Sequence, residues 1–104
     1  MKTIQHFVNG KSFSGESKRT GKIFNPATGE QSAEVKLAPT KDTNEAVASA
    51  KKVFESWSNT PPLQRARVMF KFKELIEKNS DELTKLIVEE HGKVYEDAKG
   101  SLTR

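Results

Sequence analysis

The stretch 61–93 constrains the fold of this chain more than any other, because its apolar residues recur at helical spacing. At about 100° per residue, five apolar side chains share one face of its first part. They are Val68, Met69, Phe72, Leu75 and Ile76. A second apolar face follows, formed by Leu83, Leu86 and Ile87. The spacing predicts helices over 62–78 and 80–91.

Both predicted helices carry residues that favour helix ends. Pro61 and Pro62 suit a first turn, since the first amides of a helix have no partner within it. The run Asn79-Ser80-Asp81 interrupts the apolar pattern with residues that favour helix caps. Gly92 is a typical helix stop. We therefore expect two antiparallel helices joined by a tight turn.

Two charged residues break the apolar pattern. Arg65 falls inside the apolar sector of the first helix, and Glu90 falls in the middle of that of the second. Because an unpaired charge is costly to bury, we expect each to be paired or hydrogen-bonded, with each other as one candidate pair. The alternative is that both lie at the helix margins and extend their charged ends into solvent.

The segment 41–57 predicts a further amphipathic helix upstream. Its apolar residues form one narrow stripe, and polar residues occupy the rest of the surface. The stripe consists of Ala46, Val47, Ala50, Val53, Phe54 and Trp57. Thr40 is the expected N-cap, and Asp42 in the first turn complements the helix dipole.

The residues before this helix predict two β-hairpins over 1–38. Asn9-Gly10 lies between short arms, and both central residues of a type I′ turn need positive φ. The second hairpin has arms at 22–24 and 31–37, joined by a turn that contains proline and glycine.

After Gly92, the run 94–99 starts a fourth helix, which Gly100 weakens. The fold class is therefore α+β. It comprises two N-terminal hairpins, three amphipathic helices and the start of a fourth, in a single partial domain over 1–104.

The composition excludes several classes of function. Only 34% of the 104 residues are apolar, so the core should be thin for a chain of this length. No cysteine is present, which excludes disulfides, thiolate metal sites and a thiol nucleophile within these residues. No run reaches the ~18 apolar residues of a membrane span, and the first residues lack the apolar region of a signal peptide. The net charge of +4 comes from interspersed charges, which favours a solvated surface over a nucleic-acid partner.

No catalytic or metal-binding pattern stands out. His6 and His91 are far apart, and neither has a second ligand at helical spacing. The turn at 25–29 has one glycine and no P-loop lysine, so it is a poor phosphate loop. Glu89 and Glu90 are adjacent on a helix and point about 100° apart, so they cannot form a close acid–base pair.

Five segments in order carry a family resemblance. They read HFVNGK, FNPATGE, EAVASAKKVFESWS, RARVMFKFKELIEKNSDEL and EEHGKVYEDAKG. From about His6 to Arg104 the chain resembles the N-terminal region of the aldehyde dehydrogenase superfamily. TPPLQRARVMFKFKELIE and EEHGK look most like its CoA-acylating branch, the methylmalonate-semialdehyde dehydrogenases.

The resemblance implies part of a NAD-dependent enzyme in which a cysteine attacks the aldehyde, hydride passes to NAD and CoA takes the acyl group. In this branch, methylmalonate or malonate semialdehyde would give propionyl-CoA or acetyl-CoA with loss of carbon dioxide. The family's nucleophile, general base, oxyanion-hole asparagine and main NAD contacts lie beyond position 104. We therefore expect no activity from this chain alone and neither NAD nor CoA bound to it. The expected compartment is the cytoplasm, or the mitochondrial matrix in a eukaryote.

The resemblance also carries three candidate site residues onto this chain. Arg104 matches the position that grips the substrate carboxylate in this branch, a task that suits a bidentate guanidinium. The alternative for Arg104 is an ordinary surface arginine at a frayed end. The backbone carbonyl of Phe24 and the side chain of Glu90 match positions that hold a structural monovalent cation in some superfamily members. Other members have Asp at the second of these positions, so this chain departs from the pattern there.

Three functional hypotheses follow: a segment of an acylating aldehyde dehydrogenase, an autonomous interaction module that reuses this segment, and a small basic nucleic-acid binder. A severed segment should leave Trp57, Phe70 or Leu63 on exposed patches that the remainder of the dehydrogenase would cover. It should then be poorly stable or self-associate. An autonomous module should be monomeric and unfold cooperatively. Nucleic-acid binding should weaken steeply as salt rises.

Overall fold

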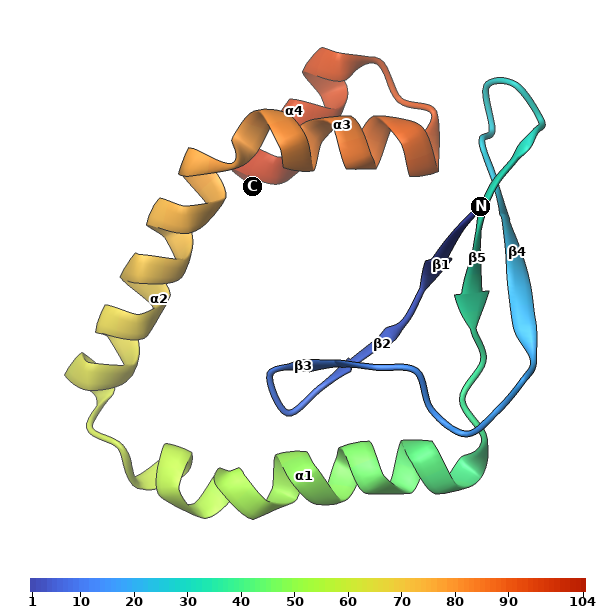
Figure 1. Cartoon of the computed structure of the whole chain (residues 1–104). Helices are drawn as coiled ribbons and strands as arrows, with labels where there is room; N and C mark the ends of the chain where they lie inside the picture. The colour runs from blue at the N-terminus through green and yellow to red at the C-terminus, as the bar shows by residue number, and fades with distance from the viewer. The chain divides into compact units, whose positions relative to one another are not determined.

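The computed structural model describes all residues from Met1 to Arg104. Five strands are followed by four helices (Figure 1). The strands are β1 (Lys2–Ile4), β2 (His6–Val8), β3 (Lys11–Phe13), β4 (Thr20–Phe24) and β5 (Gln31–Lys36). The helices are α1 (Thr40–Asn59), α2 (Pro62–Lys78), α3 (Ser80–His91) and α4 (Tyr95–Thr103). The predicted α+β class, with strands first and helices after, is confirmed.

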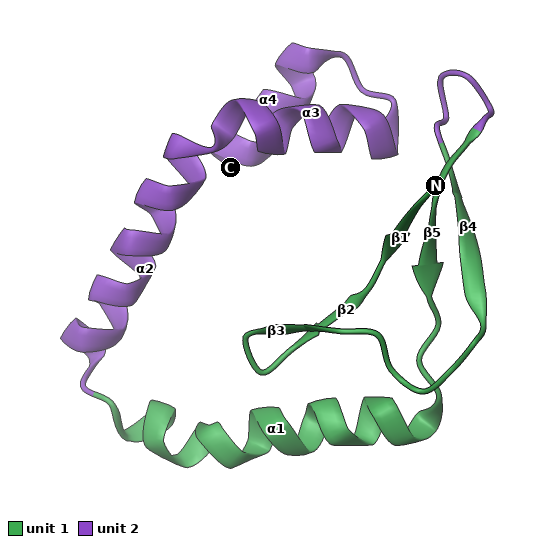
Figure 2. Ribbon diagram, in the orientation of Figure 1, with its two compact units in different colours: residues 1–24, 31–60 green, residues 25–30, 61–104 purple.

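The chain forms two compact units, shown in green and purple in Figure 2. Unit 1 comprises residues 1–24 and 31–60, and unit 2 comprises residues 25–30 and 61–104. Unit 1 holds all the strands and α1, whereas unit 2 holds the β4–β5 turn and the other three helices. No helix is long and apolar enough to cross a membrane.

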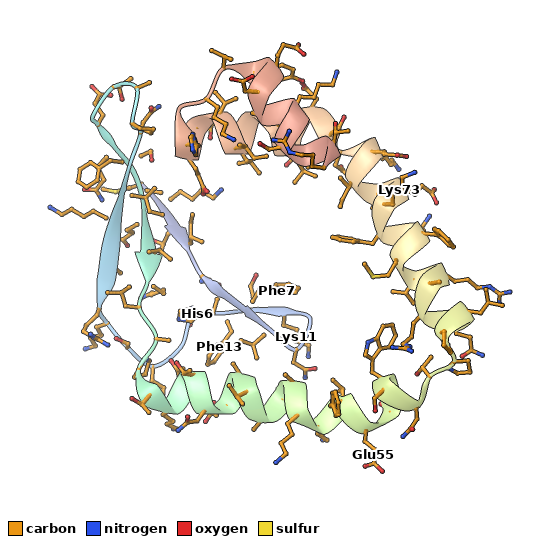
Figure 3. The ribbon with its side chains drawn as sticks, turned by 180° about the vertical axis from the view of Figure 1, so that it is seen from behind. His6, Phe7, Lys11, Phe13, Glu55 and Lys73 are labelled. Atoms are coloured by element: carbon orange, nitrogen blue, oxygen red, sulfur yellow. The ribbon has the colours of Figure 1, made fainter.

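Both predicted hairpins are present in the structure. In the first, β2 pairs with β3, and Asn9 and Gly10 have φ of 51° and 73°, as a type I′ turn requires. The rings of His6 and Phe13 pack across this hairpin with centroids 6.2 Å apart (Figure 3). In the second, β4 pairs antiparallel with β5.

One strand was missed by the sequence analysis. β1 pairs with β5 in parallel, along the edge of β5 opposite to the one that pairs with β4, so the larger sheet has the order β1-β5-β4. Ala33 in the middle of the central strand is the buried residue of this sheet.

Helix α1 begins one residue earlier than predicted. Pro39 occupies the N-cap position and its carbonyl accepts a hydrogen bond from the Thr43 amide at 3.2 Å, whereas Thr40 is already helical. The prediction that Thr40 is the N-cap is therefore wrong. No side chain makes a capping hydrogen bond at this end of the helix, and Asp42 in its first turn is the acidic group that complements the helix dipole.

Within unit 2, the expected antiparallel pairing of the two helices over 62–78 and 80–91 is wrong. Helix α3 packs against α4, whereas it meets α2 only near their junction (Figure 1). The single residue Asn79 separates the two helices, and an antiparallel helix pair needs a loop of about two to five residues to reverse the chain. Thr84 and Ala98, both fully buried, are the buried residues of α3 and α4.

The expected pairing of Arg65 with Glu90 fails for the same reason. Arg65 lies in the first turns of α2 and Glu90 lies near the end of α3, so the two occupy the far ends of helices that meet at Asn79. The four ion pairs of the structure involve neither residue. Glu90 is exposed, whereas the Nε of Arg65 is buried without a hydrogen-bond partner. The alternative of solvent exposure therefore holds for Glu90 only.

The predicted start of a fourth helix is confirmed, because α4 begins at Tyr95. It runs through Gly100 to Thr103. Gly92, at φ 81°, ends α3 in the left-handed conformation, as predicted, and its amide donates to the Val88 carbonyl at 2.8 Å. Two residues then suffice to reach the first turn of α4 at Tyr95.

Candidate functional site

A groove lies between α2 and α4 in unit 2. It has a volume of about 690 Å³. Its apolar lining comes from Met69, Phe72 and Ile76 on α2 and from Leu102 on α4. Such a combination of an apolar floor with a few polar groups is typical of small-molecule sites.

Charged side chains surround this apolar floor unevenly. Lys73 on α2, labelled in Figure 3, forms an ion pair with Glu77 at 3.4 Å, so these two charges offset each other. Lys99 and Arg104 also line the groove, and neither takes part in an ion pair. The groove therefore has an excess of positive charge on its α4 side, which favours an anionic ligand.

Arg104 is the predicted site residue that the structure places on this groove. Its amide donates to the Gly100 carbonyl at 3.2 Å, so its backbone continues the geometry of α4. Its Nη2 donates to the Ser101 Oγ at 3.5 Å, a long hydrogen bond. The remaining N–H groups of the guanidinium have no protein acceptor, which leaves them available for a carboxylate.

A polar cluster clamps the start of α4 onto α3. The Tyr95 hydroxyl donates to Asp81 Oδ1 at 2.7 Å, and Lys85 Nζ lies 2.9 Å from Asp81 Oδ2. The hydrogen bond from Lys85, followed by that from Tyr95, lowers the pKa of Asp81. The same carboxylate raises the pKa of Lys85 and of Tyr95, chiefly through these hydrogen bonds. The cluster therefore helps to fix the helix that carries Lys99 and Arg104.

The two residues predicted to hold a monovalent cation belong to different units. Phe24 ends β4 in unit 1, and Glu90 lies on α3 in unit 2. The Glu90 side chain is exposed and makes no ion pair. No group of three or more His, Cys, Asp or Glu side chains is arranged to hold a metal ion. The cation site stays a prediction.

A buried carboxylate in unit 1 was not recognised as such from the sequence. Asp42 is 3% exposed, and its Oδ2 accepts a hydrogen bond from the Glu16 amide at 3.1 Å. Gly15 has φ 70°, and a Cβ at this position would overlap Asp42 Oδ2. Glu16 in turn pairs with Lys41 at 2.7 Å, which raises the pKa of Lys41. This arrangement anchors the loop between β3 and β4 to the first turn of α1.

The residues of this chain do not fit a dinucleotide. A Rossmann site needs a glycine-rich turn between a strand and a helix, and the six glycines of this chain are scattered singly. The positive-φ glycines lie in separate turns at Gly10, Gly15, Gly29 and Gly92. These glycines therefore do not form a Rossmann-type dinucleotide site.

A family model describes the sequence from residue 13 to residue 104 as the aldehyde dehydrogenase family. The chain belongs to the aldehyde dehydrogenase family. The resemblance found from its five motifs is thereby confirmed, and the chain is similar to proteins named malonate-semialdehyde and methylmalonate-semialdehyde dehydrogenase.

Among curated proteins, the malonate-semialdehyde dehydrogenase of Pseudomonas aeruginosa is 44% identical over 104 residues. The match covers 100% of this chain and 21% of that protein. Malonate-semialdehyde dehydrogenase 3 of Geobacillus kaustophilus is 40% identical over 103 residues, with 99% of this chain and 21% of that protein covered. The chain thus spans about a fifth of the length of these relatives.

Solved structures agree with these relatives. The methylmalonate-semialdehyde dehydrogenase of Oceanimonas doudoroffii matches with a TM-score of 0.94 and 50% identity, covering 99% of this chain and 21% of that one. A protein of Sinorhizobium meliloti 1021 assigned to the same activity, and solved with NAD, matches with a TM-score of 0.96 and 45% identity. That match covers 100% of this chain and 21% of that protein. The fold seen here is therefore that of the N-terminal portion of these dehydrogenases.

Proposed function

We propose that this chain is the N-terminal segment of a NAD-dependent, CoA-acylating dehydrogenase that converts malonate or methylmalonate semialdehyde into acetyl-CoA or propionyl-CoA with loss of carbon dioxide. Similarity to relatives named for these two semialdehydes supports the substrate class. The observation that carries the proposal within this chain is the position of Arg104, a cation without an acidic partner on an apolar groove.

The role of Arg104 is to bind the carboxylate that distinguishes these semialdehydes from simple aldehydes. A guanidinium is permanently charged and offers parallel donors that match a carboxylate. The apolar floor beside it would contact the carbon chain of the substrate. Because the carboxylate is absent from propionaldehyde, Arg104 should affect the two substrates differently.

The chemical steps belong to the rest of the dehydrogenase. The chain has no cysteine, so it cannot form the thiohemiacetal through which the family oxidises its aldehydes. We expect no NADH when the isolated chain is mixed with NAD, CoA and malonate semialdehyde. NADH formation by the isolated chain would refute this part of the proposal.

The partner of this segment is the remainder of the dehydrogenase, in the cytoplasm. Trp57, Leu63 and Phe70 are 43%, 63% and 68% exposed, so they would be covered by that partner. In the isolated chain the same side chains would favour self-association. Phe24 and Glu90 would contribute to a monovalent cation site only in the assembled enzyme.

A chimera tests the proposal directly. Residues 1–104 replace the matching segment of the Pseudomonas aeruginosa malonate-semialdehyde dehydrogenase, to which they are 44% identical. We expect NADH formation from malonate semialdehyde in the presence of NAD and CoA. The isolated chain and the truncated relative serve as controls. A chimera that is folded and has the same oligomeric size as its parent but is inactive would contradict the proposal.

Substitution of Arg104 in this chimera tests the residue. Arg104→Leu should raise KM for malonate semialdehyde by about 10- to 100-fold, the effect of losing hydrogen bonds to a charged group. KM for propionaldehyde should change little. Arg67→Leu, which removes an exposed arginine that lies outside the groove, is the matched control. If Arg104→Leu raised KM equally for both aldehydes, the proposed role of Arg104 would be contradicted.

The second candidate is an autonomous interaction module without catalysis. It differs from the first in its physical behaviour, because a module should be monomeric and unfold in one cooperative transition. The exposure of Trp57, Leu63 and Phe70 favours the dehydrogenase segment instead. Sedimentation of the isolated chain separates the two, since a monomer at all concentrations would favour the module.

A further inference from the structure

The Ser101 side chain on α4 has three hydrogen-bond partners. Its Oγ accepts from Lys93 Nζ at 2.9 Å and from Arg104 Nη2 at 3.5 Å. It lies 3.3 Å from the Asp97 carbonyl, to which it donates. Ser101 thus connects Lys93, which follows the end of α3, with the arginine on the α2–α4 groove.

The direction of each hydrogen bond follows from the chemistry of the partners. A serine hydroxyl has one donor proton and two acceptor lone pairs. The lysine ammonium and the arginine guanidinium have donors only, so both must donate to the oxygen. The hydroxyl proton must then point at the Asp97 carbonyl. All three bonding positions of Ser101 are occupied, and one lone pair is held in the direction of Arg104 Nη2.

Within this chain, Ser101 is the hydrogen-bond partner of the Arg104 side chain. It follows the last residue of α4, it is exposed, and it forms no ion pair. Position 100, one turn earlier, is glycine, and a Cβ there would lie 4.0 Å from Arg104 Nη1. The guanidinium therefore lies along the α4 surface, next to Gly100 and Ser101. A long side chain that is already ordered loses less entropy when it binds a ligand.

The contact with Ser101 leaves the binding capacity of Arg104 intact. Only one of the five guanidinium N–H groups donates to Ser101, so a pair of parallel donors remains free for a carboxylate. Ser101 itself is absent from the groove lining, whereas Arg104 is part of it. Ser101 therefore acts on a ligand in the groove through Arg104 rather than by direct contact.

We propose that Ser101, oriented by Lys93, is a positioning residue that holds the Arg104 guanidinium at the α2–α4 groove for binding of the substrate carboxylate. This inference rests on the proposed function for its substrate, but the positioning itself is a property of the chain. The two parts can therefore be tested separately, with one measurement on the isolated chain and one on the chimera.

The first measurement is the mobility of the Arg104 side chain in the isolated chain. The ¹⁵N relaxation of its Nε–Hε group reports motion on the picosecond to nanosecond timescale. We expect Ser101→Ala to increase this mobility and Ser101→Thr, which keeps the hydroxyl, to preserve it. Ser58→Ala is the matched control, because Ser58 also bonds to a backbone carbonyl of its own helix but contacts no cation. Unchanged mobility in Ser101→Ala would overturn the positioning role.

The second measurement is made in the chimera with both aldehydes. Ser101→Ala should raise KM for malonate semialdehyde by about two- to tenfold, the effect of losing one hydrogen bond, with kcat little changed. KM for propionaldehyde should not change, and Ser101→Thr should restore the wild-type value. If Ser101→Ala changes both aldehydes alike, or kcat alone, the inference is wrong even though the dehydrogenase is active. If the chimera is inactive, the proposed function fails, and with it the substrate half of this inference.

Discussion

Gly15→Ala tests whether the buried Asp42 carboxylate anchors the loop between β3 and β4. Gly15 has φ 70°, and an added Cβ would overlap Asp42 Oδ2, the oxygen that accepts the Glu16 amide. Gly10 has nearly the same φ, 73°, but a Cβ there meets nothing within 4 Å. Gly10→Ala therefore has the same backbone strain without the displaced carboxylate, and the pair of variants isolates the contribution of Asp42.

The expected magnitudes follow from these two terms. A left-handed conformation costs a non-glycine residue about 1–2 kcal/mol, and this applies to both variants. Displacement of Asp42 in Gly15→Ala adds the loss of a hydrogen bond to a charged group, about 1.5–3 kcal/mol. Gly15→Ala should thus lower the free energy of unfolding by about 1.5–3 kcal/mol more than Gly10→Ala does.

Urea unfolding followed by circular dichroism measures this difference. All variants should be compared in the same concentration of trimethylamine N-oxide, which strengthens the folded state and keeps a folded baseline for the weaker ones. The double variant Gly15→Ala with Asp42→Ala should lose less free energy of unfolding than the two single variants lose in sum, because no carboxylate then overlaps the new Cβ. Equal destabilisation by Gly10→Ala and Gly15→Ala, or strict additivity in the double variant, would refute the reasoning.

Two further predictions concern the clamp on α4 and the exposed apolar surface. The lowered pKa of Asp81 means that its stabilising effect is present above its ordinary value of 3.8 and is lost as pH falls through the lowered native value. Tyr95→Phe removes one of the two hydrogen bonds responsible, so ¹³C NMR titration of the Asp81 carboxyl should show a higher pKa in this variant, and an unchanged value would contradict the clamp. The pKa of Tyr95 is raised, so its stabilising effect is complete below its ordinary value of 10.0 and is lost as pH rises through the higher native value. This loss of stability at alkaline pH should be absent from the unfolding curve of Tyr95→Phe. Phe70→Glu should reduce self-association of the isolated chain in sedimentation velocity, whereas Lys71→Glu, on an exposed neighbouring position, should not.

Local signals in the sequence predicted most of the elements. The Asn9-Gly10 turn requires positive φ at two adjacent residues, and few other dipeptides tolerate that. Pro61, Asn79 and Gly92 likewise mark helix ends by their own backbone preferences, and the structure places helix boundaries beside each of them. These elements could be predicted because each depends on residues within a few positions of one another.

Contacts between distant segments could not be predicted in this way. β1 has three residues and no distinctive pattern, and it is a strand only because β5 offers a parallel partner some thirty residues later, as in the pairing of Lys2 with Ala33. Asp42 suited the helix dipole by its position alone, but its burial depends on Gly15 and Glu16. The link from Lys93 through Ser101 to Arg104 is closer in sequence, yet it needs the exact turn between α3 and α4.

The apolar stripes of α1 and α2 show what periodicity can and cannot predict. The stripes are present, but α2 buries none of its residues and α1 buries only Asp42. A fully buried Val, Leu, Ile or Phe side chain contributes about 1.5–3 kcal/mol, whereas ordering each residue costs about 1–2 kcal/mol of backbone entropy. The largest fully buried side chain of this chain is Thr84. The apolar stripes of α1 and α2 therefore gain little of the stabilisation that full burial would give them. A partner that covers the apolar stripe of α1 and the exposed Leu63 and Phe70 of α2 would bind the folded state selectively and so stabilise it.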